Sequence, residues 1–526
     1  MMETCAADGV DTCAWIEAQP WSDGQVGMMG TSYVGGTQHV LAMAEGGCPQ
    51  LKTIIPVDAM SNMGRVSVRN NGAFELRFFN WIFSIGLPTG AQQTKDAGVR
   101  GVLTEMSEQR IDYMDTLPLR PGTTPLSLAP QYEDWLVSAM EAGSATDERW
   151  EINAIVDYPE RYQDIPVYLV GGWYDSWTAS TCWNFETLTK QLTSDVYLIM
   201  GPWIHGQQQA HSHGQVDFGQ AAAIADPVAW RLAWFDSVMQ PEKSSAVGVS
   251  APFRTKVRIF VMGGGDGHRT DDGLLYHGGE WRDEVEWPLA RAVPTEFFLS
   301  AEGGLGRDPP TAAEASTEWE ADPANPVPSI GGNTSSGGGI LLQGAYDQKG
   351  GPHVYNSPEP IPLSNRNDVV CFRSAPLAED MEVTGTPVAK LFVETDGPDA
   401  DFTAKLVDVY PPSPDFPGGF DLQIGEAIVR GRFAADRSEE TPLVPGQVVE
   451  LTVGLYPTCN VFKKGHRLRL DIASSCYPRF DLNPNTGEKL NDNRRTRVAT
   501  NAVHHCAGRP SSLTLPVVPS AGRAAL

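Results

Sequence analysis

The chain has 526 residues, and 65 acidic against 39 basic side chains give it a formal net charge of −26 at pH 7. This length predicts two or three domains, because single domains rarely exceed about 300 residues. The negative charge would repel phosphate groups, which argues against a nucleic acid as partner. No apolar run approaches the roughly 20 residues that span a bilayer, so we expect no membrane partner either.

The N-terminal sequence and the cysteines suggest a compartment. Residues 1–5 have neither the basic stretch nor the apolar stretch of a secretory signal. The eight cysteines are scattered and form no Cys-x-x-Cys pair, which is typical of reduced thiols. We therefore expect a cytoplasmic protein.

Residues 1–60 and 150–250 alternate short apolar strands with helical patterns, which predicts one α/β domain whose parallel sheet is covered on both faces. The expected strands are Gln25–Met29, Thr53–Val57, Val167–Gly171 and Val196–Met200, and the expected helices include Asp11–Gln19 and Pro227–Met239.

Residues 61–149 interrupt this pattern and are rich in aromatic side chains. Phe74, Phe78 and Trp81 recur at helical spacing, which predicts an inserted cap of helices. The aromatic stripe either packs as the core of these helices or lines a pocket in part.

From residue 254 to residue 526 the alternation of polar and apolar residues has a period of two, as in Lys256–Met262 and Arg467–Ile472. Many short strands with Gly and Pro turns predict an all-β sandwich or jelly roll. Residues 301–361 are so rich in turn formers that we expect a long surface loop there.

The most informative segment is the turn after the first expected strand. Its sequence, Gly-Thr-Ser-Tyr-Val-Gly over residues 30–35, has glycines on both sides of Ser32. A nucleophile on a sharp strand-to-helix turn needs small neighbours, since bulky ones would clash. At such a turn the backbone N–H of Tyr33 and the helix dipole can stabilise an oxyanion. Taken alone, the segment also fits a glycine-rich turn with an incidental serine.

Two more polar residues end buried strands farther along the chain. Asp175 follows the strand Val167–Gly171, and His205 follows Val196–Met200. Parallel sheets build their sites beyond the carboxyl ends of strands, and the order Ser32, Asp175, His205 is that of an α/β-hydrolase triad. Ser32 would attack an acyl carbon, His205 would transfer the proton, and Asp175 would orient the imidazole.

The remaining histidines have weaker claims to a function. His211 and His213 could be read as a metal pair, but no third ligand has suitable spacing, and a polar loop is the better interpretation. His504 and His505 fit a structural role. We expect no metal and no cofactor.

These segments resemble the cocaine esterase and X-Pro dipeptidyl-peptidase family of serine hydrolases, which includes glutaryl-7-aminocephalosporanic acid acylases and α-amino-acid ester hydrolases. The resemblance rests on residues 30–35, 172–175 and 201–205 and continues through residues 322–328, 401–410 and 478–485. It implies an α/β-hydrolase domain with an inserted helical cap and a C-terminal jelly roll. It also implies hydrolysis of small-molecule esters or amides through Ser32, Asp175 and His205.

One departure from the family concerns substrate recognition. Some α-amino-acid ester hydrolases carry a Glu-Asp pair after the catalytic Asp, whereas Ser176 and Trp177 follow Asp175 here. We therefore expect Trp177 and Trp81 to bind an apolar or aromatic acyl group, and X-Pro dipeptidyl-peptidase activity is less favoured. Packing at a domain interface remains the other interpretation of Trp177.

A second departure is the early position of Ser32, because only one expected strand precedes it. About four strands of the family's sheet, with the tyrosine that donates the second oxyanion hydrogen bond, have no counterpart, so we expect the α/β-hydrolase domain to be N-terminally incomplete. A catalytically impaired relative that binds partners through its jelly roll is the competing hypothesis, and an acyltransferase is a third. Three intact catalytic residues favour the hydrolase, which could form a homodimer.

Overall fold

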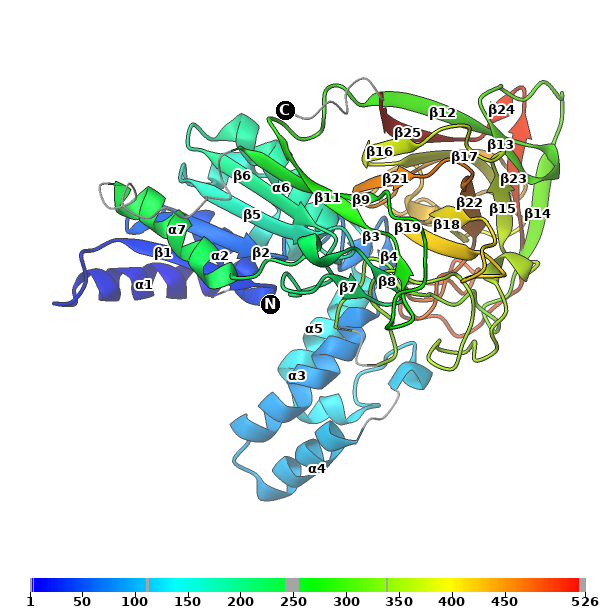
Figure 1. Cartoon of the computed structure of the whole chain (residues 1–526). Coiled ribbons are helices and arrows are strands. Elements are labelled where there is room, and N and C mark those ends of the chain that lie inside the picture. The colour runs from blue at the N-terminus through cyan, green and yellow to red at the C-terminus, as the bar shows by residue number, and fades with distance from the viewer. Residues whose placement is uncertain (1, 3, 110–112, 242–254, 337–338, 520–526) are drawn as a thin grey trace.

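A parallel sheet with flanking helices, an inserted group of helices and a large antiparallel β region make up the computed structural model (Figure 1). It describes residues 2, 4–109, 113–241, 255–336 and 339–519. Residues 242–250, which we expected to close the α/β domain, and residues 520–526 of the β domain lie outside the described residues. Within the described part of the chain, no helix is both long and apolar enough to cross a bilayer.

Parallel pairing runs through five strands in the order β1-β2-β5-β6-β9. These strands are β1 (Val26–Thr31), β2 (Leu51–Val57), β5 (Val167–Gly172), β6 (Val196–Gly201) and β9 (Val257–Gly263). The first four lie within two residues of their predicted bounds. Among the described residues β1 pairs with β2 alone, so the strand that leads into Ser32 is the edge of this parallel sheet.

Helices cover both faces of the sheet. Neighbouring residues of a strand point to opposite faces, so adjacent residues of β2 pack against different helices. Ile54 shares a core with Leu41 of α2, whereas Ile55 shares one with Trp230 and Trp234 of α7. The flanking helices are α1 (Cys5–Glu17), α2 (Tyr33–Ala42), α6 (Thr178–Gln191) and α7 (Pro227–Met239). Helix α1 begins six residues before the predicted start, since alanines 6 and 7 favour helix there.

Three helices and a short hairpin lie between β2 and β5 in the chain, and the helices project away from the sheet in Figure 1. They are α3 (Arg77–Gln93), α4 (Ala97–Glu108), α5 (Pro130–Glu141), β3 (Arg69–Asn70) and β4 (Ala73–Phe74). The predicted helical stripe is correct for Phe78 and Trp81. It is wrong for Phe74, which belongs to β4 because the turn at Gly72, with φ of 92°, folds the chain into a hairpin.

The β region packs two groups of antiparallel strands around one core. It joins the parallel sheet through β9, which pairs with both β6 and β21. Its strands are β11 (Gly279–Glu284), β12 (Val293–Ser300), β13 (Gly304–Gly306), β14 (Ser316–Ala321), β15 (Val370–Arg373), β16 (Met381–Gly385), β17 (Val388–Thr395), β18 (Asp401–Tyr410), β19 (Phe420–Arg430), β20 (Val449–Gly454), β21 (Thr458–Phe462), β22 (Arg467–Ala473), β23 (Ala499–Cys506), β24 (Arg509–Pro510) and β25 (Ser512–Val518), with the short β7 (Ser212–His213), β8 (Val216–Asp217) and β10 (Leu275–Tyr276) beside them.

The surface loop predicted over residues 301–361 is wrong in two respects. The segment contains β13 and β14, and β14 pairs with β23. Its residues Ile330 and Asn333 are buried. Burial is possible because polar groups of this segment find partners in the α/β domain, as when the Asn333 amide donates to the Trp173 carbonyl at 2.6 Å.

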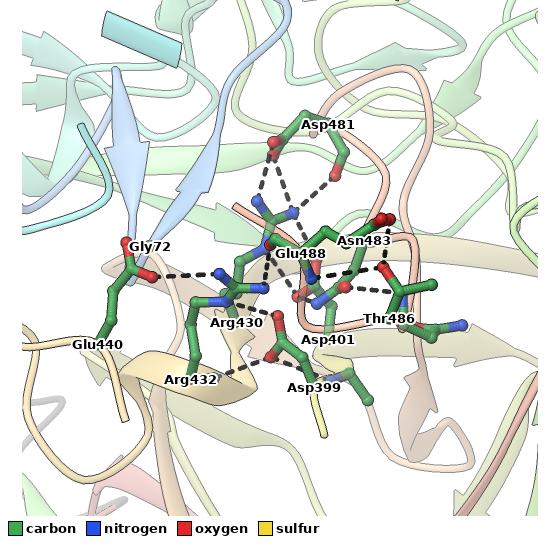
Figure 2. A network of polar contacts seen from close by, with 12 residues as sticks. Gly72, Asp399, Asp401, Arg430, Arg432, Glu440, Asp481, Asn483, Thr486 and Glu488 are labelled. Carbon is green, nitrogen blue, oxygen red and sulfur yellow. Dashed lines mark hydrogen bonds and ion pairs between the residues drawn. The ribbon is translucent and has the colours of Figure 1, made fainter. Parts of the chain in front are cut away.

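A buried ion-pair network fixes the hairpin at the base of the cap to the β region (Figure 2). Arg430 at the end of β19 pairs with Asp401 and Asp481, each at 2.9 Å. The Asp481 carboxylate in turn accepts the backbone N–H of Phe74 at 2.7 Å. Because Arg430 and Asp401 are almost fully buried and Asp481 is largely buried, these pairs give the cap a defined attachment beside the sheet.

Candidate active site

The turn between β1 and α2 has the geometry of a nucleophile elbow. Ser32 has φ of 65° and ψ of −125°, a strained conformation for a residue with a side chain. Its N–H donates to the Val57 carbonyl at 2.9 Å, which ties the turn to β2. A Cβ atom at Gly35 would lie 3.0 Å from the Cβ of Ala59. The close approach of α2 to β2 therefore explains why a glycine follows the serine at this spacing.

Asp175 and His205 come together beyond the ends of β5 and β6. The His205 Nδ1 donates to the Asp175 Oδ1 at 2.5 Å, and the second Asp175 oxygen accepts the N–H of Trp177. Asp175 is fully buried, whereas 17% of the His205 side chain is exposed. A Cβ at Gly206 would lie 3.8 Å from the Thr31 side chain, so the His205 loop runs beside the elbow. The imidazole is thus oriented and still accessible.

The surroundings of His205 favour its protonated form. Burial opposes the positive charge, but the charge of Asp175, the hydrogen bond to it and the charge of Asp58 together raise the pKa of the His205 imidazole above its usual value. An imidazole whose cationic form is stabilised is a better acceptor for a serine proton.

A second carboxylate, which the sequence analysis missed, lies in the same place. Asp58 directly follows β2, and its Oδ2 accepts the Gly206 N–H at 2.8 Å and the Gln208 Nε2 at 2.7 Å. Ligand-type atoms of Asp58, Asp175 and His205 lie within 4.8 Å of one another. Desolvation and the charge of Asp175 raise the pKa of the Asp58 carboxyl to about 7. Its position after a buried strand was the available signal, since Asp175 ends the next strand in the same way.

A cavity of about 760 Å³ opens beside the elbow. Tyr33 and Trp81 stack in its wall with ring centroids 6.4 Å apart, and Tyr132 and Trp135 of α5 complete an aromatic lining. Asp134 is the acidic residue of this lining. The cap thus places a largely apolar pocket next to the residue that follows Ser32.

Trp177 lies deeper than Trp81 and is 1% exposed. Its ring meets Phe78 edge-on with centroids 6.1 Å apart, and the Arg77 guanidinium lies 4.7 Å from its centroid. Phe78 in turn contacts Trp81. Trp177 therefore supports the aromatic wall from behind, and its direct contact with a substrate stays a prediction.

The potential metal ligands of the site are already engaged with one another. Asp58, Asp175 and His205 form the group of three such side chains found among the described residues, but the 2.5 Å hydrogen bond joins two of the three directly. The His211 Nδ1 donates to the Asp217 carboxylate at 3.0 Å, and the His213 Nε2 donates to the Pro202 carbonyl. Both histidines therefore have structural partners. Burial also lowers the pKa of the His213 imidazole to about 4.

Known proteins share this arrangement of domains. Residues 1–207 match the family model described as X-Pro dipeptidyl-peptidase (S15 family), and residues 254–514 match the model of the X-Pro dipeptidyl-peptidase C-terminal non-catalytic domain. The cocaine esterase of Rhodococcus sp. (strain MB1 Bresler) is 30% identical over 541 aligned positions, which cover 97% of this chain and 84% of that protein.

Two solved structures are similar in fold. An aminopeptidase from the marine sediment archaeon Thaumarchaeota archaeon superposes with a TM-score of 0.74, and an α-amino acid ester hydrolase superposes with a TM-score of 0.73. Each is 24% identical in sequence, and each alignment covers 98% of this chain and 80% of the other.

Proposed function

Because the chain belongs to the cocaine esterase and X-Pro dipeptidyl-peptidase family of hydrolases, we propose that it cleaves ester or amide bonds of small molecules by a serine mechanism. Ser32 is the nucleophile, His205 the general base and acid, and Asp175 the residue that orients the imidazole. The observation that carries this proposal is the 2.5 Å bond between Asp175 and His205 beside a serine in a strained elbow.

The reaction proceeds through an acyl-enzyme. The Ser32 Oγ attacks the substrate carbonyl carbon while His205 Nε2 takes the hydroxyl proton, and Asp175 stabilises the imidazolium that forms. The N–H of Tyr33 at the start of α2 stabilises the oxyanion, aided by the helix dipole. Collapse of the tetrahedral intermediate expels the alcohol or amine, which receives the proton from His205. Water then repeats the sequence and releases the acid.

The pocket favours esters and amides whose acyl or leaving group is apolar or aromatic. Tyr33, Trp81, Tyr132 and Trp135 offer ring surfaces against which apolar or aromatic groups can pack. The residues after Asp175 include no carboxylate pair that could bind a free α-ammonium group. X-Pro dipeptidyl-peptidase activity, which needs such an anchor, is therefore the less favoured form of the same chemistry.

Labelling with a fluorophosphonate probe tests the nucleophile. We expect the parent chain to be labelled and Ser32→Ala to lose labelling completely, whereas the control Ser84→Ala on the exposed side of α3 keeps it. Labelling of folded Ser32→Ala would refute the assignment of the nucleophile. A folded parent chain that neither reacts with the probe nor hydrolyses esters would favour the binding-protein hypothesis.

A pair of substrates tests the preferred bond. We expect turnover of a p-nitrophenyl ester to exceed turnover of a Gly-Pro anilide, because the pocket offers aromatic surface and lacks the carboxylate pair. Turnover of the anilide alone would overturn the preference for esters and side-chain amides.

A further inference from the structure

We propose that Asp58 is a positioning residue of this hydrolase, whose buried carboxylate anchors the His205 loop and adds a second negative charge beside the imidazole. The proposal rests on the proposed function, because it assigns Asp58 a role in the step in which His205 takes the proton of Ser32.

The hydrogen bonds of Asp58 reach the residue next to the catalytic base. Its Oδ2 accepts the Gly206 N–H at 2.8 Å and the Gln208 Nε2 at 2.7 Å. Gly206 has φ of 71°, so the loop turns sharply directly after His205. A carboxylate that holds this turn limits how far the imidazole can move relative to the elbow, and displacements of about 1 Å in such sites reduce rates about 100-fold.

The anchoring alone does not explain why the residue is an acid. The second oxygen, Oδ1, is buried and has no hydrogen-bond partner among the described residues, and Asp58 itself has φ of 44°. An asparagine could accept the same two hydrogen bonds without placing a charge in the interior. Strain and an unsatisfied buried oxygen on one residue are characteristic of positions retained for function.

The charged groups around Asp58 and the His205 imidazole come from four elements of the fold. Asp175 comes from the end of β5 and His205 from the end of β6, Arg231 approaches from α7, and Arg77 acts on His205 from the cap. Repulsion from Asp175 opposes ionisation of Asp58, whereas an imidazolium at His205 favours it. Protonation of His205 during catalysis therefore draws Asp58 toward its charged form, and that charge stabilises the imidazolium in return.

Asp58→Asn separates the charge from the hydrogen bonds. We expect the acidic limb of kcat/KM for a p-nitrophenyl ester to move to lower pH by about half a unit or more, because His205 loses a stabilising charge, with KM nearly unchanged. The matched control is Asp408→Asn. Asp408 is also fully buried, accepts a hydrogen bond from a histidine (His466, 2.8 Å) and has one oxygen without a partner in the described part of the chain, but it lies in the β region. An unmoved limb in Asp58→Asn, or an equal shift in the control, would refute the role of the charge.

Asp58→Ala removes the hydrogen bonds as well. In the fraction that folds, we expect kcat to fall by about 30-fold or more below that of Asp58→Asn, with KM within about threefold. Equal kcat values for the two variants would refute the anchoring role.

Nuclear magnetic resonance of ¹⁵N-labelled imidazoles measures the same effect without a substrate. The His205 signal is identified by its loss in His205→Ala, and we expect its pKa to be lower in Asp58→Asn than in the parent. If the parent hydrolysed no ester, the proposed function would fail, and this titration would still decide the influence of Asp58. An identical pKa of His205 in both proteins would overturn the proposal.

Discussion

A methyl group at Gly172 tests whether the ends of β5 and β6 control catalysis. Gly172 is the last residue of β5, and a Cβ there would lie 2.2 Å from the carbonyl oxygen of Trp203. That carbonyl accepts the N–H of Tyr174 at 3.1 Å. The Gly172→Ala methyl therefore intrudes between the two turns that carry Asp175 and His205.

The size of the effect follows from the geometry. Cβ atoms essentially never approach another heavy atom within 3.0 Å, so the two turns must separate by roughly 0.8 Å. The Asp175–His205 hydrogen bond is 2.5 Å long in the parent. If most of that movement reaches this bond, the new separation exceeds the usual hydrogen-bond length. We expect kcat/KM to fall by about 100-fold and the free energy of unfolding to fall by about 1–3 kcal/mol.

The assay combines hydrolysis of p-nitrophenyl butyrate with the rate of fluorophosphonate labelling and a thermal unfolding curve. The control is Gly454→Ala, because Gly454 also ends a strand, β20, and a Cβ there would have no atom of the described residues within 4 Å. We expect the control to keep parental activity. Folded Gly172→Ala with parental kcat/KM would refute the link between strand-end spacing and catalysis.

Three more expectations follow from the site and from the network in Figure 2. Trp81→Ala should raise KM for aryl esters about tenfold, because the cavity wall loses about 1–2 kcal/mol of contact. Steady-state kinetics with aryl and acetyl esters measure this, and equal KM values of variant and parent for aryl esters would contradict it. The raised pKa of His205 predicts that kcat/KM declines as pH falls through a value above 6.5, since the imidazolium cannot accept the serine proton; a pH–rate profile with a midpoint below 6.5 would contradict the sign. Arg430→Met should lower the free energy of unfolding by about 3–5 kcal/mol, because Asp401 and Asp481 lose their buried partner; an unchanged urea midpoint would contradict this.

The parallel sheet was predictable because its strands β2, β5 and β6 are almost entirely buried. Val167–Gly172 and Val196–Gly201 are continuous apolar runs, and each is followed by a polar residue that stands out against them. The same contrast identified Asp175 and His205. The pairing of these two side chains then follows from the adjacency of β5 and β6, which the short strand–helix–strand spacing already indicated.

The same signal was too weak to assign Asp58, because a lone acid after a strand usually caps a helix or a turn. Its importance depends on β2 lying between β1 and β5, and on Gly206 and Gln208, which are about 150 positions away in the chain. The buried segment around Ile330 and Asn333 was missed for a related reason. Its composition describes local turns, whereas its burial depends on partners in another domain.

The β region contributes to the geometry of the proposed triad through long-range contacts. Asn333 donates to the carbonyl of Trp173 at 2.6 Å, Tyr174 donates its hydroxyl to the Gln423 carbonyl at 2.8 Å, and the hydroxyls of Ser335 and Ser176 bond at 2.8 Å.

All three contacts hold the turn that carries Asp175, on both sides of that residue. A β region that served only as a separate binding module would have no need to support a catalytic turn in a neighbouring domain. The contacts support the proposed hydrolase function, because an acid that orients an imidazole must itself be fixed within a fraction of an ångström. Under the proposed mechanism, the β region supplies part of that rigidity.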